Sequence, residues 1–199
     1  VPNLRFISPR NQLGGFGGGN NVVRGLKTGA FNVYGDYPQI NRQEPMIITV
    51  GRFINQNDIE ENRKVAVIGD GVKNELYEKG EDVLGTYVKI QGVNFMVVGT
   101  YKKKSNNGDG EESQKEIFVP FTAFSQAFNM GNDVGRMAIT AQDGSSISDL
   151  KEKILSIVKE KRKIHPDDKR AVGYFDLYEQ FNRVESLFGA LRWVAYFVG

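Results

Sequence analysis

The sequence contains no cysteine and a single histidine, His165, among its 199 residues. Disulfide-stapled scaffolds, cysteine nucleophiles and sites with several histidine ligands are therefore excluded. The absence of cysteine fits the cytoplasm and an oxidising compartment equally well, so it does not locate the protein. Charge is nearly balanced, with 26 basic against 24 acidic residues. This balance argues against electrostatic binding of nucleic acid, and no nucleic-acid partner is expected.

Hydrophobic residues make up 40% of the chain and aromatic residues 11%, which is enough to build the core of one domain or two small subdomains. Short apolar runs predict strands at residues 3–8, 21–27, 46–50, 64–69, 86–90, 95–104, 116–120, 135–142 and 170–176. A short helix is predicted between Asp70 as its N-cap and Gly80 as its stop. Two longer helices follow, one over 145–162 and one that starts at Leu177.

These two longer helices carry regular apolar patterns. The first has a capping box formed by Ser146 and Asp149, and its apolar face consists of Ile147, Leu150, Ile154 and Val158. In the second, apolar residues alternate at spacings of four and three, at Leu177, Phe181, Val184, Phe188, Leu191, Ala195 and Val198. Such a heptad seam predicts packing against the base of the domain or against the same helix of a dimer partner.

The chain closes on LFGALRWVAYFVG, whose only charged residue is Arg192. This run is shorter than the roughly 20 apolar residues that a helix needs to cross a bilayer. Trp193 and Tyr196 are residue types found at the membrane–water boundary, and the arginine side chain can reach that boundary too. We therefore expect the start of a transmembrane helix, the alternative being a C-terminal core helix. From the start at Val1 we expect a segment of a larger membrane protein.

Two stretches imitate binding motifs only partly. Gly69 and Gly71 follow a strand and open a helix, as in dinucleotide-binding folds, but Asn74 stands where the third glycine belongs. The tract 105–116 has calcium-loop spacing, with Asn107, Asp109, Gly110 and Glu116 in place. However, Ser105 replaces the first aspartate, and the flanking segments are typical of strands. A strand-to-helix turn and a solvated hairpin loop are the favoured interpretations.

The sequence HPDD offers His165, Asp167 and Asp168 as metal ligands, but three adjacent loop residues rarely point inward together. A turn is the favoured interpretation. No G-x-S-x-G motif accompanies the single histidine. The sequence therefore predicts no catalytic residue, no cofactor-binding residue and no metal ligand, and the protein is not expected to be an enzyme.

The segment that begins GRFINQND and ends FMVVGTY resembles the central signature of MacB-like periplasmic core domains. These are the extracytoplasmic domains of ABC-transporter permeases in the MacB, LolC/LolE and FtsX superfamily. The matching residues are Gly51-Arg52-Phe53, Asp58, Val65-Ala66-Val67-Ile68-Gly69, Leu76-Tyr77, Leu84-Gly85, Gly92, Phe95, Val97-Val98-Gly99 and Val119-Pro120. The similarity runs from about residue 31 to the end, where LRWVAYFVG looks like the entry to the family's second transmembrane helix.

The resemblance implies an α+β fold in two parts. A porter-like α/β subdomain would comprise residues 1–33 and 134–176. A small α/β insertion, known in this family as the Sabre subdomain, would comprise residues 34–133. Residues 177–199 would form a stalk helix and the start of a transmembrane helix. In this arrangement Leu177, Phe181, Val184, Phe188 and Leu191 pack along the stalk, and Arg192, Trp193 and Tyr196 lie at the membrane interface.

The resemblance also implies a function without chemistry or cofactor. The domain would lie on the periplasmic side of the bacterial inner membrane and couple cytoplasmic ATP hydrolysis to export or to a periplasmic partner. Expected partners are its own transmembrane helices, an ATP-binding cassette subunit or domain, a second copy in a homodimer, and a periplasmic adaptor protein. The alternatives are an FtsX/LolC-like regulatory or lipoprotein-releasing permease domain, a secreted calcium-stabilised binding domain, and a nucleotide-binding α/β enzyme.

Overall fold

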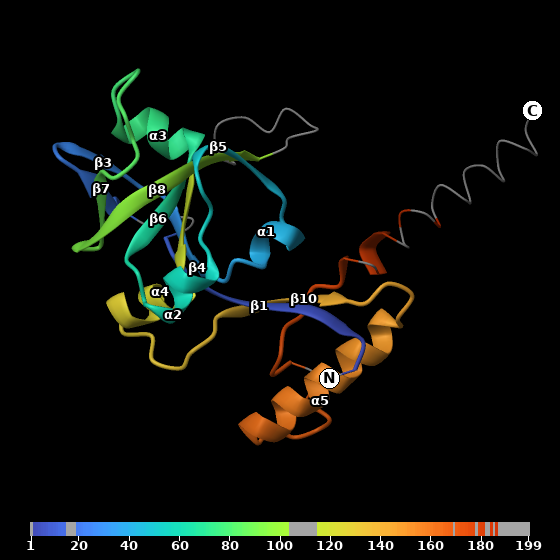
Figure 1. Cartoon of the computed structure of the whole chain (residues 1–199). Coiled ribbons are helices and arrows are strands. Elements are labelled where there is room, and N and C mark those ends of the chain that lie inside the picture. The colour runs from blue at the N-terminus through green and yellow to red at the C-terminus, as the bar shows by residue number, and fades with distance from the viewer. Residues whose placement is uncertain are drawn as a thin grey trace, which may run out of the picture. The chain divides into compact units, whose positions relative to one another are not determined.

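The computed structural model describes residues 2–14, 19–103, 115–168, 170–177, 179–181, 184 and 186 (Figure 1). The chain forms two compact units. The larger unit is Phe6–Thr140, and the smaller unit combines Val1–Arg5 with Ala141–Gly199. The larger unit is built around a sheet, whereas the main regular element of the smaller unit is one long helix.

The described strands form one mixed sheet in the order β10-β1-β4-β9-β6-β8-β7-β2-β3, with β5 paired to β8 outside this path. The strands are β1 (Leu4–Leu13), β2 (Val22–Arg24), β3 (Lys27–Gly29), β4 (Asn32–Asp36), β5 (Met46–Gly51), β6 (Val65–Gly69), β7 (Tyr87–Ile90), β8 (Val93–Lys103), β9 (Glu116–Pro120) and β10 (Arg136–Ala141). The helices are α1 (Ile40–Gln43), α2 (Gln56–Glu60), α3 (Asp70–Leu76), α4 (Phe121–Ala127) and α5 (Ile147–Arg162). The mixed α+β fold agrees with the fold class expected from the sequence.

The central strands are buried on both faces, which explains their unbroken apolar runs. In β6, Ile68 belongs to a core cluster that includes residues of α3 and α4. The neighbouring Val67 belongs to a second cluster, on the opposite face, together with Ile40 of α1. Because successive side chains of a strand point to opposite faces, a single short strand supplies both cores.

Two hairpins lie beside each other in the sheet. The predicted hairpin is confirmed as β7 and β8, joined by Gln91 and Gly92 at φ values of 43° and 88°, as a tight two-residue turn requires. The single strand expected at 21–27 is wrong. Gly25, with φ 58°, turns the chain there and divides the segment into β2 and β3.

Two further local predictions are wrong. Helix α3 has Gly69 as its N-cap rather than Asp70, and it ends at Leu76, before Gly80. The backbone turns away from the helix at Tyr77, which adopts extended dihedral angles. The strand expected at 170–176 is also absent, since the described residues of that segment form bends and irregular chain.

Helix α5 confirms its predicted start and its predicted apolar face. The Ser146 hydroxyl accepts a hydrogen bond from the backbone N–H of Asp149 at 3.2 Å, and a left-handed Lys163 ends the helix. Leu150 is buried, and the other three residues of the face are partly buried: Ile147, Ile154 and Val158.

Candidate functional site

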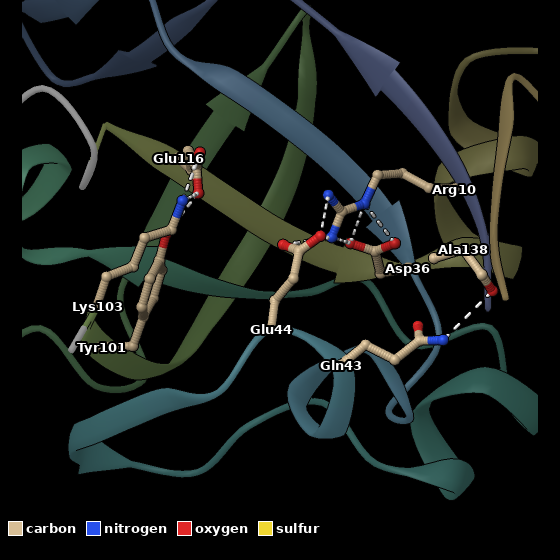
Figure 2. Close-up of polar contacts among 8 residues, drawn as sticks. All are labelled: Arg10, Asp36, Gln43, Glu44, Tyr101, Lys103, Glu116 and Ala138. Carbon is tan, nitrogen blue, oxygen red and sulfur yellow. Dashed lines mark hydrogen bonds and ion pairs between the residues drawn. The ribbon is translucent and has the colours of Figure 1, made fainter. Parts of the chain in front are cut away.

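A buried arginine joins three segments of the larger unit (Figure 2). The Arg10 Nε of β1 donates to both carboxylate oxygens of Asp36, at the end of β4, at 2.8 and 2.9 Å. Its two terminal nitrogens donate to the Glu44 carboxylate at 3.3 Å each. The guanidinium also lies 4.5 Å from the ring centre of Tyr34. A buried charge is tolerated here because each side of it has a charged or aromatic partner.

Asp36 is the most unusual acid of this group, because its side chain has no exposed surface. Burial raises the pKa of Asp36 to about 6, since the hydrogen bonds and the charge of Arg10 oppose the effect without cancelling it. The negative charge of Glu44 raises this pKa further. Asp36 therefore exchanges its proton in a mildly acidic range, while Arg10 stays charged.

A second polar group connects β8 and β9, the two strands that flank β6 in the sheet (Figure 2). The Tyr101 hydroxyl donates to Glu116 at 3.1 Å, and Lys103 Nζ donates to the same carboxylate at 2.9 Å. Glu116 is the last position of the calcium-loop spacing, and its carboxylate accepts hydrogen bonds from these two protein donors. The segments that flank the tract 105–116 are strands, β8 and β9, as expected. Residues 105–114 of that tract lie outside the described residues.

Helix α1 is tied to β10 in the same region (Figure 2). Gln43 Nε2 donates to the backbone oxygen of Ala138 at 3.3 Å and to the Thr140 hydroxyl at 2.8 Å. Together with Glu44, which holds Arg10, the end of α1 thereby contacts two strands at one side of the sheet. The group is a structural clamp, and it contains no pairing of a nucleophile with a base.

Four of the residues that carry the family resemblance lie close together, and we call them the signature cluster (Gly51, Arg52, Asp58 and Gly99). The buried carboxylate of Asp58 accepts hydrogen bonds from Arg52 at 2.6 and 3.0 Å and caps α2 through the backbone N–H of Asn55. Burial alone would raise the pKa of Asp58, but these hydrogen bonds and nearby Arg63 lower it. The two glycines let strands β5 and β8 approach closely. These residues therefore connect β5, β8 and the start of α2.

A junction in the smaller unit connects α5 to the predicted terminal helix. The Asp176 carboxylate accepts a hydrogen bond from Lys151 Nζ of α5 at 3.1 Å. Its other oxygen accepts from the backbone N–H of Glu179 at 3.1 Å, which caps the helical turn that follows. Lys151 also lies 4.9 Å from the ring centre of Tyr174. One carboxylate thus fixes both the start of the terminal helix and its link to α5.

The predicted stalk and membrane residues are only partly within the described structure. Leu177, Phe181 and Val184 are helical, and their exposed fractions are 75%, 64% and 49%. The remaining predicted residues lie outside the described residues: Phe188, Leu191, Arg192, Trp193 and Tyr196. The packing of this seam therefore stays a prediction. No helix among the described residues is both long enough and apolar enough to span a membrane.

The other motif-like stretches have structural roles. The Gly69–Gly71 segment is a strand-to-helix turn, as the favoured interpretation held. HPDD forms a turn in which Asp168 N donates to the His165 carbonyl at 3.0 Å. Within the described ranges, no three acidic or histidine side chains lie close enough together to hold a metal ion.

Sequence reasoning missed the ion pair between Arg10 and Asp36. Arg10 lies inside a strand whose pattern was expected to end at residue 8, and Asp36 ends a strand that was not expected at all. A charged residue in the middle of an extended segment is the one local signal, and it does not identify its partner.

Comparison with known proteins agrees with this description. The profile of the MacB-like periplasmic core domain matches residues 1–157. The pyoverdine export ATP-binding/permease protein PvdT of Pseudomonas entomophila (strain L48) is 29% identical over 114 residues, or 57% of this chain and 17% of the relative. The macrolide export ATP-binding/permease protein MacB of Rhodospirillum rubrum is 21% identical over 169 residues, or 84% and 26%. The chain thus spans about a quarter or less of these two relatives.

The fold has solved counterparts. The periplasmic region of MacB from Actinobacillus actinomycetemcomitans superposes with a TM-score of 0.69 at 16% identity, and the match covers 82% of this chain and 70% of that chain. The profile match covers well over half of the sequence, and the signature cluster lies inside it. The chain belongs to the family of MacB-like periplasmic core domains of ABC-transporter permeases.

Proposed function

We propose that this domain transmits movement between the membrane part of an ABC permease and a partner outside the membrane, without chemistry of its own. The observation that carries the proposal is the double role of Asp176, which caps the terminal helix and pairs with Lys151 of α5. A displacement of this helix would be transmitted to α5 through the hydrogen bond between Asp176 and Lys151, whereas a flexible linker would absorb it. Charge-assisted bonds of this kind are directional and stronger than neutral ones.

The proposal assigns the chain to three parts. Residues 1–33 and 134–176 form the porter-like subdomain, residues 34–133 the Sabre-like insertion, and residues 177–199 the stalk that enters the membrane. The stalk residues Leu177, Phe181 and Val184 are exposed, which supports a role in packing against a second copy of the chain. Phe188 and Leu191 extend the same seam, and Arg192, Trp193 and Tyr196 reach the membrane surface.

The energy source and the setting are proposed from the relatives. Both curated relatives carry "export ATP-binding/permease" in their names. We infer that this domain works with an ATP-binding cassette, lies on the outer side of the bacterial inner membrane and serves export. A homodimer and a periplasmic adaptor protein complete the proposed assembly.

The test is a flexible Gly-Ser segment inserted after Phe188 in the full-length permease. This chain contributes no cysteine, so in a full-length permease freed of cysteines elsewhere a single spin label can be placed at Leu26→Cys, where the side chain is fully exposed. We expect ATP hydrolysis to continue while the ATP-dependent change in label distance between two copies is lost. The same insertion after Gly108, in the polar tract, is the control and should preserve the change. An undiminished distance change with the insertion after Phe188 would rule out the rod-like coupling.

A further inference from the structure

A hollow of about 560 Å³ lies beside α4 in the larger unit, apart from the polar groups described above. Its lining includes Tyr37, Phe121, Ser125, Gln126, Asn129 and Asn132. The hollow is open to solvent rather than enclosed, so a ligand would lie on it with one side exposed. None of the lining residues is charged, although 25% of the residues of the chain are. The hollow therefore differs in chemistry from the rest of the surface.

Two aromatic rings lie side by side in the hollow, and the sheet fixes their position. Tyr37 directly follows β4 and Phe121 directly follows β9, and these parallel strands pair so that Asp36 lies opposite Pro120. The two ring centres are 5.4 Å apart with an angle of 33° between the ring planes. Both residues are partly exposed. The register of two interior strands thus places an aromatic surface there, without any mobile segment.

Amide side chains surround these rings. Gln126, Asn129 and Asn132 make no side-chain hydrogen bond with any other described residue, so their donors and acceptors are available. The rim is firmly held, because α4 ends with Asn129 in a left-handed conformation, φ 53°, and with a hydrogen bond from Met130 N to the Ser125 carbonyl at 2.9 Å. Each amide offers two donors and one acceptor oxygen.

We propose that this hollow binds a neutral saccharide. A sugar hydroxyl both donates and accepts hydrogen bonds, and an amide side chain can accept from it or donate to it. The C–H face of a sugar ring can pack on an aromatic ring such as Tyr37 or Phe121, whereas a charged ligand would find no partner for its charge. Extended peptides commonly bind by adding a strand to an open sheet edge, but β4 and β9 are both interior strands. The proposal is independent of the coupling function, since no lining residue belongs to the junction at Asp176.

The experiment is a titration of the ¹⁵N-labelled 199-residue chain with maltotriose, cellotriose and chitotriose, followed by NMR. We expect at least one of these sugars to shift the amide signals of Gln126, Asn129 and Asn132 in a saturable way. A Gln126→Ala/Asn132→Ala variant should bind about tenfold more weakly, because hydrogen-bonding groups are lost from an otherwise intact surface. Both side chains are exposed, so the variant should fold. Asn74→Ala, which removes an exposed amide of α3, is the matched control and should bind like the parent.

Three outcomes would overturn the proposal. The first is no saturable shift with any of the three sugars. The second is unchanged affinity in the double variant, which would place the binding elsewhere. The third is tighter binding of a neutral peptide, Gly-Ser-Gly-Ser, at the same amide signals, which would assign the hollow to peptides. The two proposals fail independently: the spin-label experiment tests the coupling function alone, and the sugar titration tests the hollow alone.

Discussion

Gly51 of β5 and Gly99 of β8 face each other across the sheet, and neither position has room for a Cβ atom. A Cβ on Gly99 would lie 2.2 Å from the Arg52 carbonyl oxygen, and a Cβ on Gly51 would lie 2.2 Å from the Val98 carbonyl oxygen. Both obstacles are backbone atoms, which cannot move aside as a flexible side chain can. This close approach gives a physical reason for glycine at both places in the signature cluster.

Replacing Gly99 by alanine should therefore lower the free energy of unfolding by about 3 kcal/mol, at the upper end of the cost of overpacking. Urea unfolding followed by circular dichroism measures the change. Gly80→Ala is the control for steric blockage, because Gly80 has open space around it. Its φ of 86° is positive, unlike that of Gly99, and this backbone conformation accounts for its expected cost. It should cost only about 1 kcal/mol. Equal effects of the two substitutions would contradict the steric explanation.

The pair of Arg10 and Asp36 should show the asymmetry of buried charges. Arg10→Met leaves a buried carboxylate without its partner, and we expect the unfolding free energy near pH 7 to fall by about 3–5 kcal/mol. Adding Asp36→Asn removes the unpaired charge and should restore a large part of the loss. A double-mutant cycle at one pH measures the coupling. Additive losses would show that the two side chains do not depend on each other.

Asp36 should also make stability depend on pH in a direction opposite to that of most acids. Its pKa in the folded protein, about 6, lies above its ordinary value of 3.8, so between these values the folded state binds more protons than the unfolded state. By linkage, its contribution to stability is fully present below about pH 4 and is lost as the pH rises through 6. The unfolding free energy of the parent should therefore fall, relative to that of Asp36→Asn, as the pH rises from about 4 through 6.

Carboxyl NMR provides a direct check, with an expected titration midpoint for Asp36 near pH 6. The groups that affect it are Arg10, Glu44 and Arg136, so each spectrum should be compared with that of Glu44→Gln. Removing that neighbouring negative charge should lower the midpoint. A midpoint below pH 4 in the parent would mean that Arg10 outweighs burial.

The junction at Asp176 should control fraying of the terminal helix. Asp176→Ala removes both the cap and the partner of Lys151, and helix stability should fall by about 1 kcal/mol. Hydrogen exchange of the backbone amides at Glu179 and Gln180 should quicken about fivefold as a result. Lys151→Met, which loses the ion pair but keeps the cap, should have a smaller effect. Exposed Lys153→Met serves as the control and should leave exchange unchanged.

The sequence predicted those elements whose apolar pattern is long or distinctive. Helix α5 and the β7–β8 hairpin have such patterns, and the structure contains both. Strand β4 was missed, because its five residues include a glycine and an aspartate and show no alternation. Helices α1, α2 and α4 have four, five and seven residues and are too short to establish a helical period. These secondary-structure predictions rest on local sequence pattern, which is not sufficient where tertiary packing determines the conformation of a short segment.

The candidate site shows the same division. The motif residues Gly51, Arg52 and Asp58 were recognisable in the sequence because they lie close together along it. Residues that are close only in the folded chain could not be recognised in this way. Arg10 of β1 pairs with Asp36 of β4, and Lys151 of α5 pairs with Asp176, 25 residues later. The hollow beside α4 depends on the register of β4 against β9, and no single segment records that register.

The placement of β9 between β4 and β6 also determines when the larger unit can fold during synthesis. Strand β4 begins at Asn32, yet its neighbour in the sheet begins only at Glu116. Until the ribosome has released that later segment, β4 and β6 lack the strand between them, and both expose unpaired backbone edges. Closing a sheet through such distant partners is slow, and the waiting strands are prone to join other chains. A chain truncated before Glu116 should therefore aggregate more readily than one that includes β9.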